Sequence, residues 1–246
     1  MSAYYGMAIL VLAVLLLLGF SFLRRNSSPT LREVPAFTRL IRALGVSVEE
    51  GTRLHVSLGR GELLTPLGAA SFSGLALLRK LVERTSGSDR PLLVTSGDGV
   101  VSLLSQDTLQ AGYRAASAEE SYTPTMGQLT GLSPFSYAAG VMPLLADENV
   151  SATVLLGHFG VEVALLSDAV ERNGILAVAA SDELSAQALL YASGDEPLVG
   201  EELYAAGAYA GSGKAHEASL QTQDVLRWFI LIILFVGAVI RLLESF

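Results

Sequence analysis

The chain has 246 residues, a formal net charge of −8 and no cysteine. This length accommodates one soluble domain together with membrane anchors, since domains typically run roughly 100 to 200 residues. The acidic balance repels phosphate backbones, and no cluster of Lys and Arg offsets it, so we expect no nucleic-acid partner. The lack of cysteine excludes disulfides, thiolate nucleophiles and Cys-ligated metal centres.

An uncharged stretch near the N-terminus, Met7 to Leu23, is dominated by Leu, Val, Ala and Ile. Roughly 18 such residues at 1.5 Å rise nearly cross a hydrocarbon core of about 30 Å. A cleaved signal peptide is the alternative, but no Lys or Arg precedes the stretch, and Arg24 and Arg25 stand where a small-residue cleavage site is expected. Residues 1–25 are therefore predicted to be a retained transmembrane helix.

A second apolar stretch begins at Trp228 and continues through Ile240. It is apolar on every face, unlike an amphipathic helix at the surface of a soluble domain. Residues 213–246 are accordingly predicted to form a helix that continues into a second transmembrane span.

Positive residues indicate the orientation of the two spans. Only Arg241 lies beyond the second span, whereas the other flanking cations lie on the side of the middle segment: Arg24, Arg25, Arg32, Arg39, Arg42, Lys214 and Arg227. By the positive-inside rule, we expect a cell (inner) membrane protein with two spans and a cytoplasmic middle domain.

Short β-prone runs alternate with longer helical runs in the middle segment. Residues 26–50 are interpreted as a linker and a leading helix, roughly Pro35 to Leu44, and residues 51–212 as the soluble domain. Five strands are expected, near Leu54–Leu58, Leu92–Ser96, Met126–Thr130, Thr153–Leu156 and Ile175–Ala179. This alternation predicts an α/β fold: a parallel, doubly wound sheet of about five strands, Rossmann-like or flavodoxin-like.

Capping signals place several of the helices. Thr65-Pro66 and Ser133-Pro134 each put a hydroxyl before a proline suited to the first helical position. A last helix is expected over Glu201 to Tyr209, and the pattern from about Ala215 continues as one helix into the second apolar stretch.

The two halves of the middle domain resemble each other. Val56-Ser57-Leu58-Gly59 matches Val154-Leu155-Leu156-Gly157, and the helical run after each also shares its Ala, Leu, Val and Glu-Arg positions. This similarity predicts two related βαβ units. Coincidence is the alternative, because Ala, Leu and Val recur in any buried helix.

Ligands of doubly wound sheets bind outside the carboxyl ends of the strands. Glycines in the turns there permit tight bends and expose amides at helix N-termini, which attract anions. Candidate ligand-binding residues in these turns are Gly59, Arg60, Gly97, Asp98, Gly99, Gly157, His158 and Asp182. No turn contains a P-loop or a complete dinucleotide fingerprint, and turn geometry and capping explain the same residues without a ligand.

Catalytic and metal-binding interpretations have little support in the sequence. His158 with Asp98 has the composition of a base and its partner, and Asp98, Asp182 and Glu62 that of a divalent-cation site. A hydrogen-bonded structural histidine and helix-capping aspartates are the simpler interpretations. The Gly-x-Ser-x-Gly hydrolase motif is absent. We assign no catalytic residue, no metal ligand and no cofactor.

Several segments carry a resemblance to a known family. They are His55 to Gly61, Thr95 to Gly99 with Gln106-Asp107, Pro134 to Val141, Gly200 to Tyr209, and Gln223 to Trp228. Together they resemble an uncharacterised family of bacterial membrane proteins classed only as a domain of unknown function. The resemblance covers about Glu49 to Trp228 and implies an α/β domain with a C-terminal anchor. It implies no activity and no site residue.

These observations favour a structural or assembly role over an enzymatic one. Anchoring restricts the domain to lateral encounters beside the bilayer, which raises its effective concentration toward other copies. We expect a homo-oligomer, or binding to other membrane proteins. The alternative is a sensor or enzyme that binds a nucleotide or another small anion at the turns after the parallel strands.

Overall fold

The computed structural model describes residues 2–23, 32–61, 65, 68–193, 196–211 and 213–244. The chain divides into two compact units. Residues 32–212 form one unit, the α/β domain, and residues 1–31 with 213–246 form the other, a helical unit.

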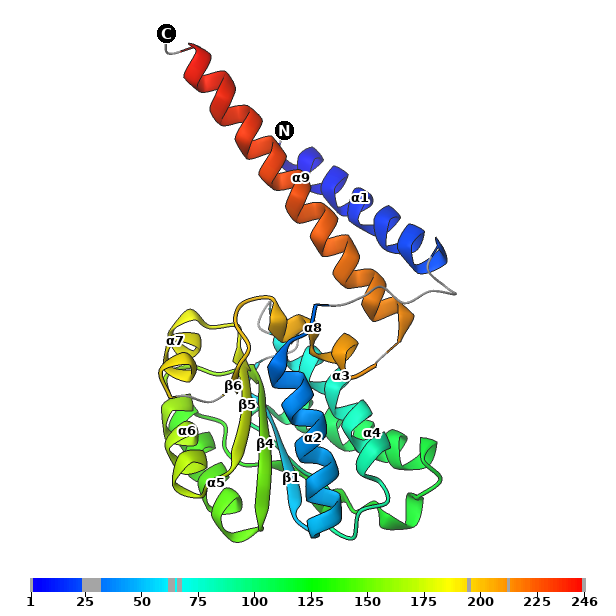
Figure 1. The fold of residues 1–246 in the computed structure, drawn as a ribbon, viewed down its shortest axis with the longest axis vertical. Coiled ribbons are helices and arrows are strands. Elements are labelled where there is room, and N and C mark those ends of the chain that lie inside the picture. Colours follow the sequence, from blue (N-terminus) through cyan, green and yellow to red (C-terminus); the bar gives the residue numbers. More distant parts are fainter. Residues whose placement is uncertain are drawn as a thin grey trace. The chain divides into compact units, whose positions relative to one another are not determined.

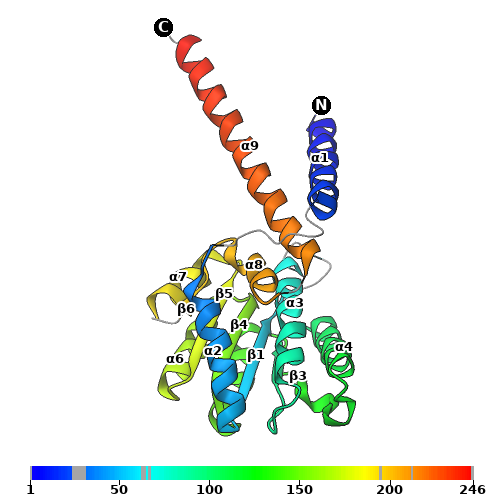
Figure 2. The ribbon, with the colours of Figure 1, turned by 45° about the vertical axis from the view of Figure 1, so that its right-hand side comes forward.

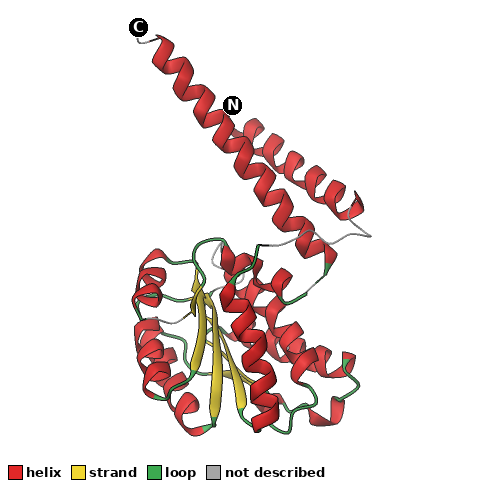
Figure 3. Cartoon of the chain, viewed as in Figure 1, coloured by secondary structure: helices red, strands yellow, loops and turns green. Residues whose placement is uncertain are grey.

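A six-stranded parallel sheet forms the centre of the α/β domain (Figures 1 and 3), with the strand order β3-β2-β1-β4-β5-β6. This is the Rossmann-like order, so the flavodoxin-like alternative is wrong. The strands are β1 (Arg53–Gly59), β2 (Leu93–Ser96), β3 (Gly127–Leu129), β4 (Val150–His158), β5 (Leu176–Ser181) and β6 (Glu196–Pro197). Five were expected; β6 was missed because it has two residues and one is a proline.

Helices cover both faces of this sheet (Figures 1 and 2). One core lies between the sheet and α2 (Pro35–Glu50), α3 (Gly68–Thr85), α4 (Gly99–Ala115) and α8 (Glu202–Tyr209). The other core lies under α5 (Pro134–Asp147), α6 (Val163–Arg172) and α7 (Leu184–Ala192). Two short 3-10 helices, η1 (Glu119–Ser121) and η2 (Pro124–Met126), precede β3.

The helix boundaries follow local chemistry. α2 runs past the expected Leu44 and ends before Gly51, whose φ of 65° is left-handed and therefore favours glycine. Ser133 caps α5 in a reciprocal capping box with Ser136, as the Ser-Pro signal predicts. The other predicted cap, Thr65-Pro66, stays a prediction, because Pro66 lies outside the described residues.

The two similar sequence segments meet at the centre of the sheet. β1–α3–β2 and β4–α6–β5 have the same order of elements, and the matching residues Val56 and Val154 are direct partners in the β1–β4 ladder. Common ancestry of the two βαβ units stays a prediction, for which superposition of the halves is the test.

Alternate residues of β1 face the two cores differently. Leu54, Val56 and Leu58 pack in the core under α2 and α3, whereas His55 and Ser57 lie on the face toward α5. His55 is completely buried, with Nδ1 2.8 Å from Thr153 Oγ1 and Nε2 2.9 Å from Thr95 Oγ1. Because a neutral imidazole has one donor and one acceptor nitrogen, two hydroxyls satisfy it fully.

Tyr137 of α5 extends this buried chain of hydrogen bonds. Its hydroxyl lies 2.5 Å from Ser57 Oγ and 3.1 Å from Thr95 Oγ1. Burial raises the pKa of Tyr137, and burial lowers the pKa of His55 from 6.5 to about 3. Both groups are therefore neutral at physiological pH, which avoids placing a charge inside the sheet.

The helical unit contains α1 (Ser2–Leu23) and α9 (Lys214–Glu244). Within the described residues, one helical segment is long and apolar enough to cross a membrane: His216–Leu243, with 28 residues, a mean hydropathy of 2.4 and no burial. α1 has 22 residues, but its apolar stretch, Ile9–Phe22, is shorter than the roughly 20 residues that a span requires. One of the two expected spans is thus supported, as is the continuous helix leading into it.

We expect the stability of the domain to depend on pH through His55. Above pH 6.5, His55 is neutral in the folded and in the unfolded chain, so its full contribution to the free energy of unfolding is present. Between pH 6.5 and about 3, the unfolded chain binds a proton that the native state does not, so the free energy of unfolding falls by about 1.4 kcal/mol per pH unit. Chemical denaturation of the detergent-solubilised chain between pH 7 and acid conditions measures this slope.

His55→Gln is the matched control, because glutamine can bond to both threonines but does not titrate. The difference in slope between wild type and this variant isolates the histidine. Identical slopes would contradict a neutral buried His55.

Candidate functional site

The candidate ligand-binding residues all lie at the carboxyl edge of the sheet. The order of strands reverses between β1 and β4, which is where doubly wound folds usually bind ligands. Here the structure brings Gly59, Arg60, Gly157 and His158 together. Gly97 lies against Arg60, and Asp182 lies beside His158, whereas Asp98 and Gly99 belong to the start of α4.

The backbones of β1 and β4 lie in close contact at the carboxyl ends of the two strands. A Cβ atom on Gly59 would lie 2.4 Å from the carbonyl oxygen of His158, and one on Gly157 would lie 2.1 Å from that of Leu58. Hydrogen bonds continue past the strand ends, from Arg60 N to His158 O at 2.9 Å and from Gly97 N to Gly59 O at 2.8 Å. These glycines therefore permit close contact between strands.

An ion pair lies beside these strand ends. The stem of Arg60 lies over Gly97, where an added Cβ would come within 2.3 Å of Arg60 Cγ. Arg60 Nε lies 3.3 Å from Oε1 of Glu162, a residue that is 1% exposed and also accepts a hydrogen bond from Gly160 N at 3.0 Å. A buried carboxylate needs such partners. The sequence analysis missed Glu162; its one signal is an acidic residue just after the glycine turn at Gly157–Gly160.

His158 forms the second hydrogen-bonded pair of the edge. Its Nδ1 lies 2.7 Å from Asp182 Oδ1, and both side chains are mostly buried. The hydrogen bond to Asp182 raises the pKa of His158, burial opposes it, and the charges of Asp182 and Glu183 raise it further. The partner of this histidine is thus Asp182, and not the Asp98 considered from the sequence.

Asp98 is a helix cap. Its Oδ1 accepts hydrogen bonds from Val100 N at 3.0 Å and Val101 N at 2.9 Å, which satisfies the free amides at the start of α4. A Cβ on Gly99 would meet nothing within 4 Å, so packing does not require that glycine. The carboxylate occupies the position that an anionic ligand would take at this helix N-terminus.

A metal site does not form from the described residues, since no three His, Asp or Glu side chains among them gather as ligands. The sequence suggested Asp98, Asp182 and Glu62 as possible cation ligands. In the structure, Asp98 caps α4 and Asp182 bonds to His158. Glu62 lies outside the described residues.

Exposed apolar side chains occupy the same edge. Because all strands are parallel, every strand-to-helix connection leaves from this edge. Each connection, or the helix it opens, exposes at least one large apolar side chain, and we call this set the apolar edge: Phe72, Val100, Leu103, Leu129, Leu132, Phe135, Val161, Leu165, Leu184 and Val199. Leu132 and Phe135 are 71% and 60% exposed. The Arg60–Glu162 and His158–Asp182 pairs lie at the ends of β1 and β4, in the middle of the apolar edge.

Comparison with protein families identifies the chain's relatives. Residues 2–246 match the family described as "Domain of unknown function (DUF6754)". The chain belongs to the DUF6754 family. No curated protein and no solved structure matches it. The resemblance seen in the sequence is thus confirmed at the level of a family of unknown function, and DUF6754 membership assigns no role to any residue.

Replacement of Asp98 by alanine tests the cap assignment. We expect the free energy of unfolding to fall by about 1 kcal/mol with no ligand present, because two amides of α4 lose their acceptor. Asp98→Ser should retain most of the stability, and chemical denaturation measures both. Unchanged stability in Asp98→Ala would contradict the capping role.

Proposed function

We propose that this DUF6754 member is a membrane-anchored structural or assembly protein whose α/β domain forms homo-oligomers through the apolar edge. One observation carries this proposal: among the described residues, each strand-to-helix connection or the helix that it opens exposes a large apolar side chain at one edge of the domain. Burial of such surface against a partner yields about 25 cal/mol per Å². Concentrations of exposed apolar residues on soluble domains commonly mark interaction sites.

The charges of the edge support contact between two copies. The chain carries a net charge of −8, so most of its surface repels another copy. At the apolar edge, Arg60 is paired with Glu162 and His158 with Asp182. Two copies can therefore meet there with Arg60 and Glu162 already paired inside each copy, in an isologous contact that uses the same surface twice.

Membrane anchoring favours the same assembly. Copies that carry the same membrane anchor diffuse in two dimensions and have the same orientation to the membrane, which raises their effective concentration toward one another. The alternative of a sensor or enzyme for a nucleotide or small anion has less support, because Asp98 occupies the N-terminus of α4 and Glu162 neutralises Arg60.

The proposed assembly includes the full topology predicted from the sequence. It places two spans in the cell membrane, with α1 crossing as well as α9, and the α/β domain in the cytoplasm. The support is the distribution of Arg and Lys beside the two apolar stretches.

Single cysteines in the cysteine-free chain test this topology. Cysteine at Asp89, an exposed position before β2, should react with an impermeant maleimide in inverted vesicles and not in intact spheroplasts. Cysteine at Ser2 should show the reverse. Labelling of both positions from the same side would exclude α1 as a span.

Charged substitutions in the apolar edge test the oligomer. Extraction in mild detergent followed by mass measurement should give an oligomer for wild type. Leu132→Asp with Phe135→Asp should raise its dissociation constant at least about tenfold, since both side chains would carry unpaired charge into the contact.

Tyr191→Asp is the matched control, because Tyr191 is 73% exposed in the last turn of α7 and does not belong to the apolar edge. It should leave the mass unchanged. A wild-type chain that is monomeric at all concentrations would refute self-association, and an oligomer that tolerates both edge substitutions would refute the apolar edge as its interface.

A further inference from the structure

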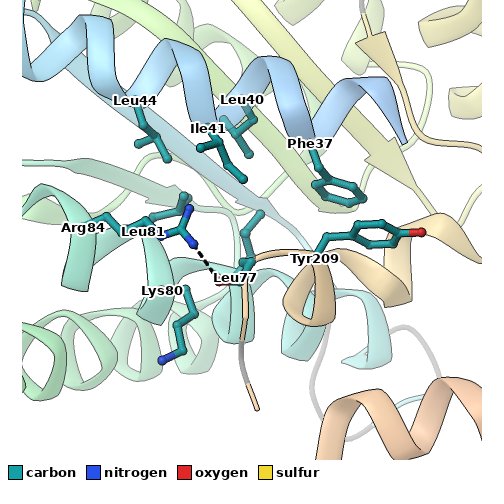
Figure 4. A pocket seen from close by; sticks show the side chains of 10 residues that line it. Phe37, Leu40, Ile41, Leu44, Leu77, Lys80, Leu81, Arg84 and Tyr209 are labelled. Atoms are coloured by element: carbon teal, nitrogen blue, oxygen red, sulfur yellow. Dashed lines mark hydrogen bonds between the residues drawn. The ribbon is translucent and has the colours of Figure 1, made fainter. Parts of the chain in front are cut away.

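A shallow apolar groove runs between α2 and α3, on one face of the domain (Figure 4). Leu40 and Leu44 of α2 and Leu77 and Leu81 of α3 line it, and all four are almost completely buried. Tyr209 stacks on Phe37 at one end, with ring centroids 4.6 Å apart. The hollow at this end is about 10 Å³, so it holds no ligand larger than a water molecule.

The groove continues along α2 beyond this hollow. Ile41, Leu44 and Arg84 also line a second hollow of about 350 Å³, together with Gly45 and Val48. Ile41 and Val48 are 44% and 38% exposed. The lining residues of α2 recur every three or four positions from Phe37 to Val48, which is one face of the helix and roughly three turns long.

Gly45 leaves the middle of this face open. A glycine inside a helix destabilises the helix relative to alanine. Packing inside the domain does not require a glycine here, since a Cβ on Gly45 would meet nothing within 4 Å. A glycine whose side-chain space is empty, on an apolar face, allows the close approach of another element.

The α3 side of the groove is basic. Lys80 pairs with Glu83 at 2.6 Å, whereas the Arg84 guanidinium donates to the carbonyl oxygen of Ala210 at 3.4 Å. Within the described part of the chain, Arg84 has no carboxylate partner. Glu49 stands at the far end of the groove, beyond Val48. An acidic group over Arg84 would complete an ion pair at the edge of an apolar contact.

We propose that this groove binds an amphipathic α-helix of a partner protein, with its apolar face on Ile41, Gly45 and Val48 and a carboxylate side chain beside Arg84. A groove between two helices, open for about three turns, matches the helix-in-groove mode of recognition. The contact is independent of self-association through the apolar edge, and it gives the anchored oligomer a second surface for a different chain.

A designed peptide is the probe for this site. It is an amphipathic helix of about four turns with leucines at i, i+3, i+4 and i+7 and glutamates beside them; a matched peptide has lysines in place of the glutamates. Fluorescence anisotropy with the full chain in nanodiscs, corrected for empty nanodiscs, measures binding. The glutamate peptide should bind at least about tenfold more tightly than the lysine peptide.

Two substitutions connect binding to the groove. Gly45→Leu should weaken binding of the glutamate peptide at least about tenfold while the melting temperature stays equal or rises, because leucine fills the open space and favours the helix. Arg84→Glu should reverse the preference between the two peptides. Val46→Leu, an exposed neighbour that does not line the groove, is the control and should bind as wild type does.

Three results would overturn the proposal: no binding of the glutamate peptide, equal binding of both peptides, or equal binding to Gly45→Leu and Val46→Leu. Loss of self-association in Gly45→Leu would also overturn it, because the groove would then be a contact between copies. An unchanged oligomer with lost peptide binding is the expected result, and it separates this site from the apolar edge.

Discussion

The parallel direction of all six strands is the constraint on which this domain depends. A parallel sheet needs a helical crossover between consecutive strands, so both of its faces are covered and its strands are buried. Every connection that leads out of a strand consequently lies at one edge. In this chain, that edge gathers the ion pairs of Arg60 and His158 and the exposed side chains of the apolar edge.

The interior and the edge use polar groups differently. Inside the sheet, His55, Thr95 and Tyr137 form hydrogen bonds as neutral groups, and burial displaces the pKa values of His55 and Tyr137 away from physiological pH. At the edge, Arg60 forms an ion pair with Glu162, and His158 forms a hydrogen bond with Asp182. The glycines at the switch point bring the backbones of β1 and β4 together.

The two proposed surfaces have different physical characters. The apolar edge joins exposed side chains around internally paired charges, which suits contact with an identical copy. The groove between α2 and α3 is concave, open at Gly45 and basic at Arg84, which suits an acidic helix. The proposed anchored assembly protein combines these two surfaces with an apolar helix long enough to span a membrane.

Local patterns in the sequence determined the α/β class, five of the strands, the cap of α5 and the long apolar helix at the C-terminus, because each depends on residues close together in the chain. They also located the turns that carry Gly59, Asp98 and His158. Only the tertiary structure decided the strand order, the pairing of Arg60 with Glu162 and of His158 with Asp182, and the grouping of scattered residues such as Leu103, Leu132 and Leu184 at one edge. These features join residues from separate strands, and no local periodicity records which strands become neighbours.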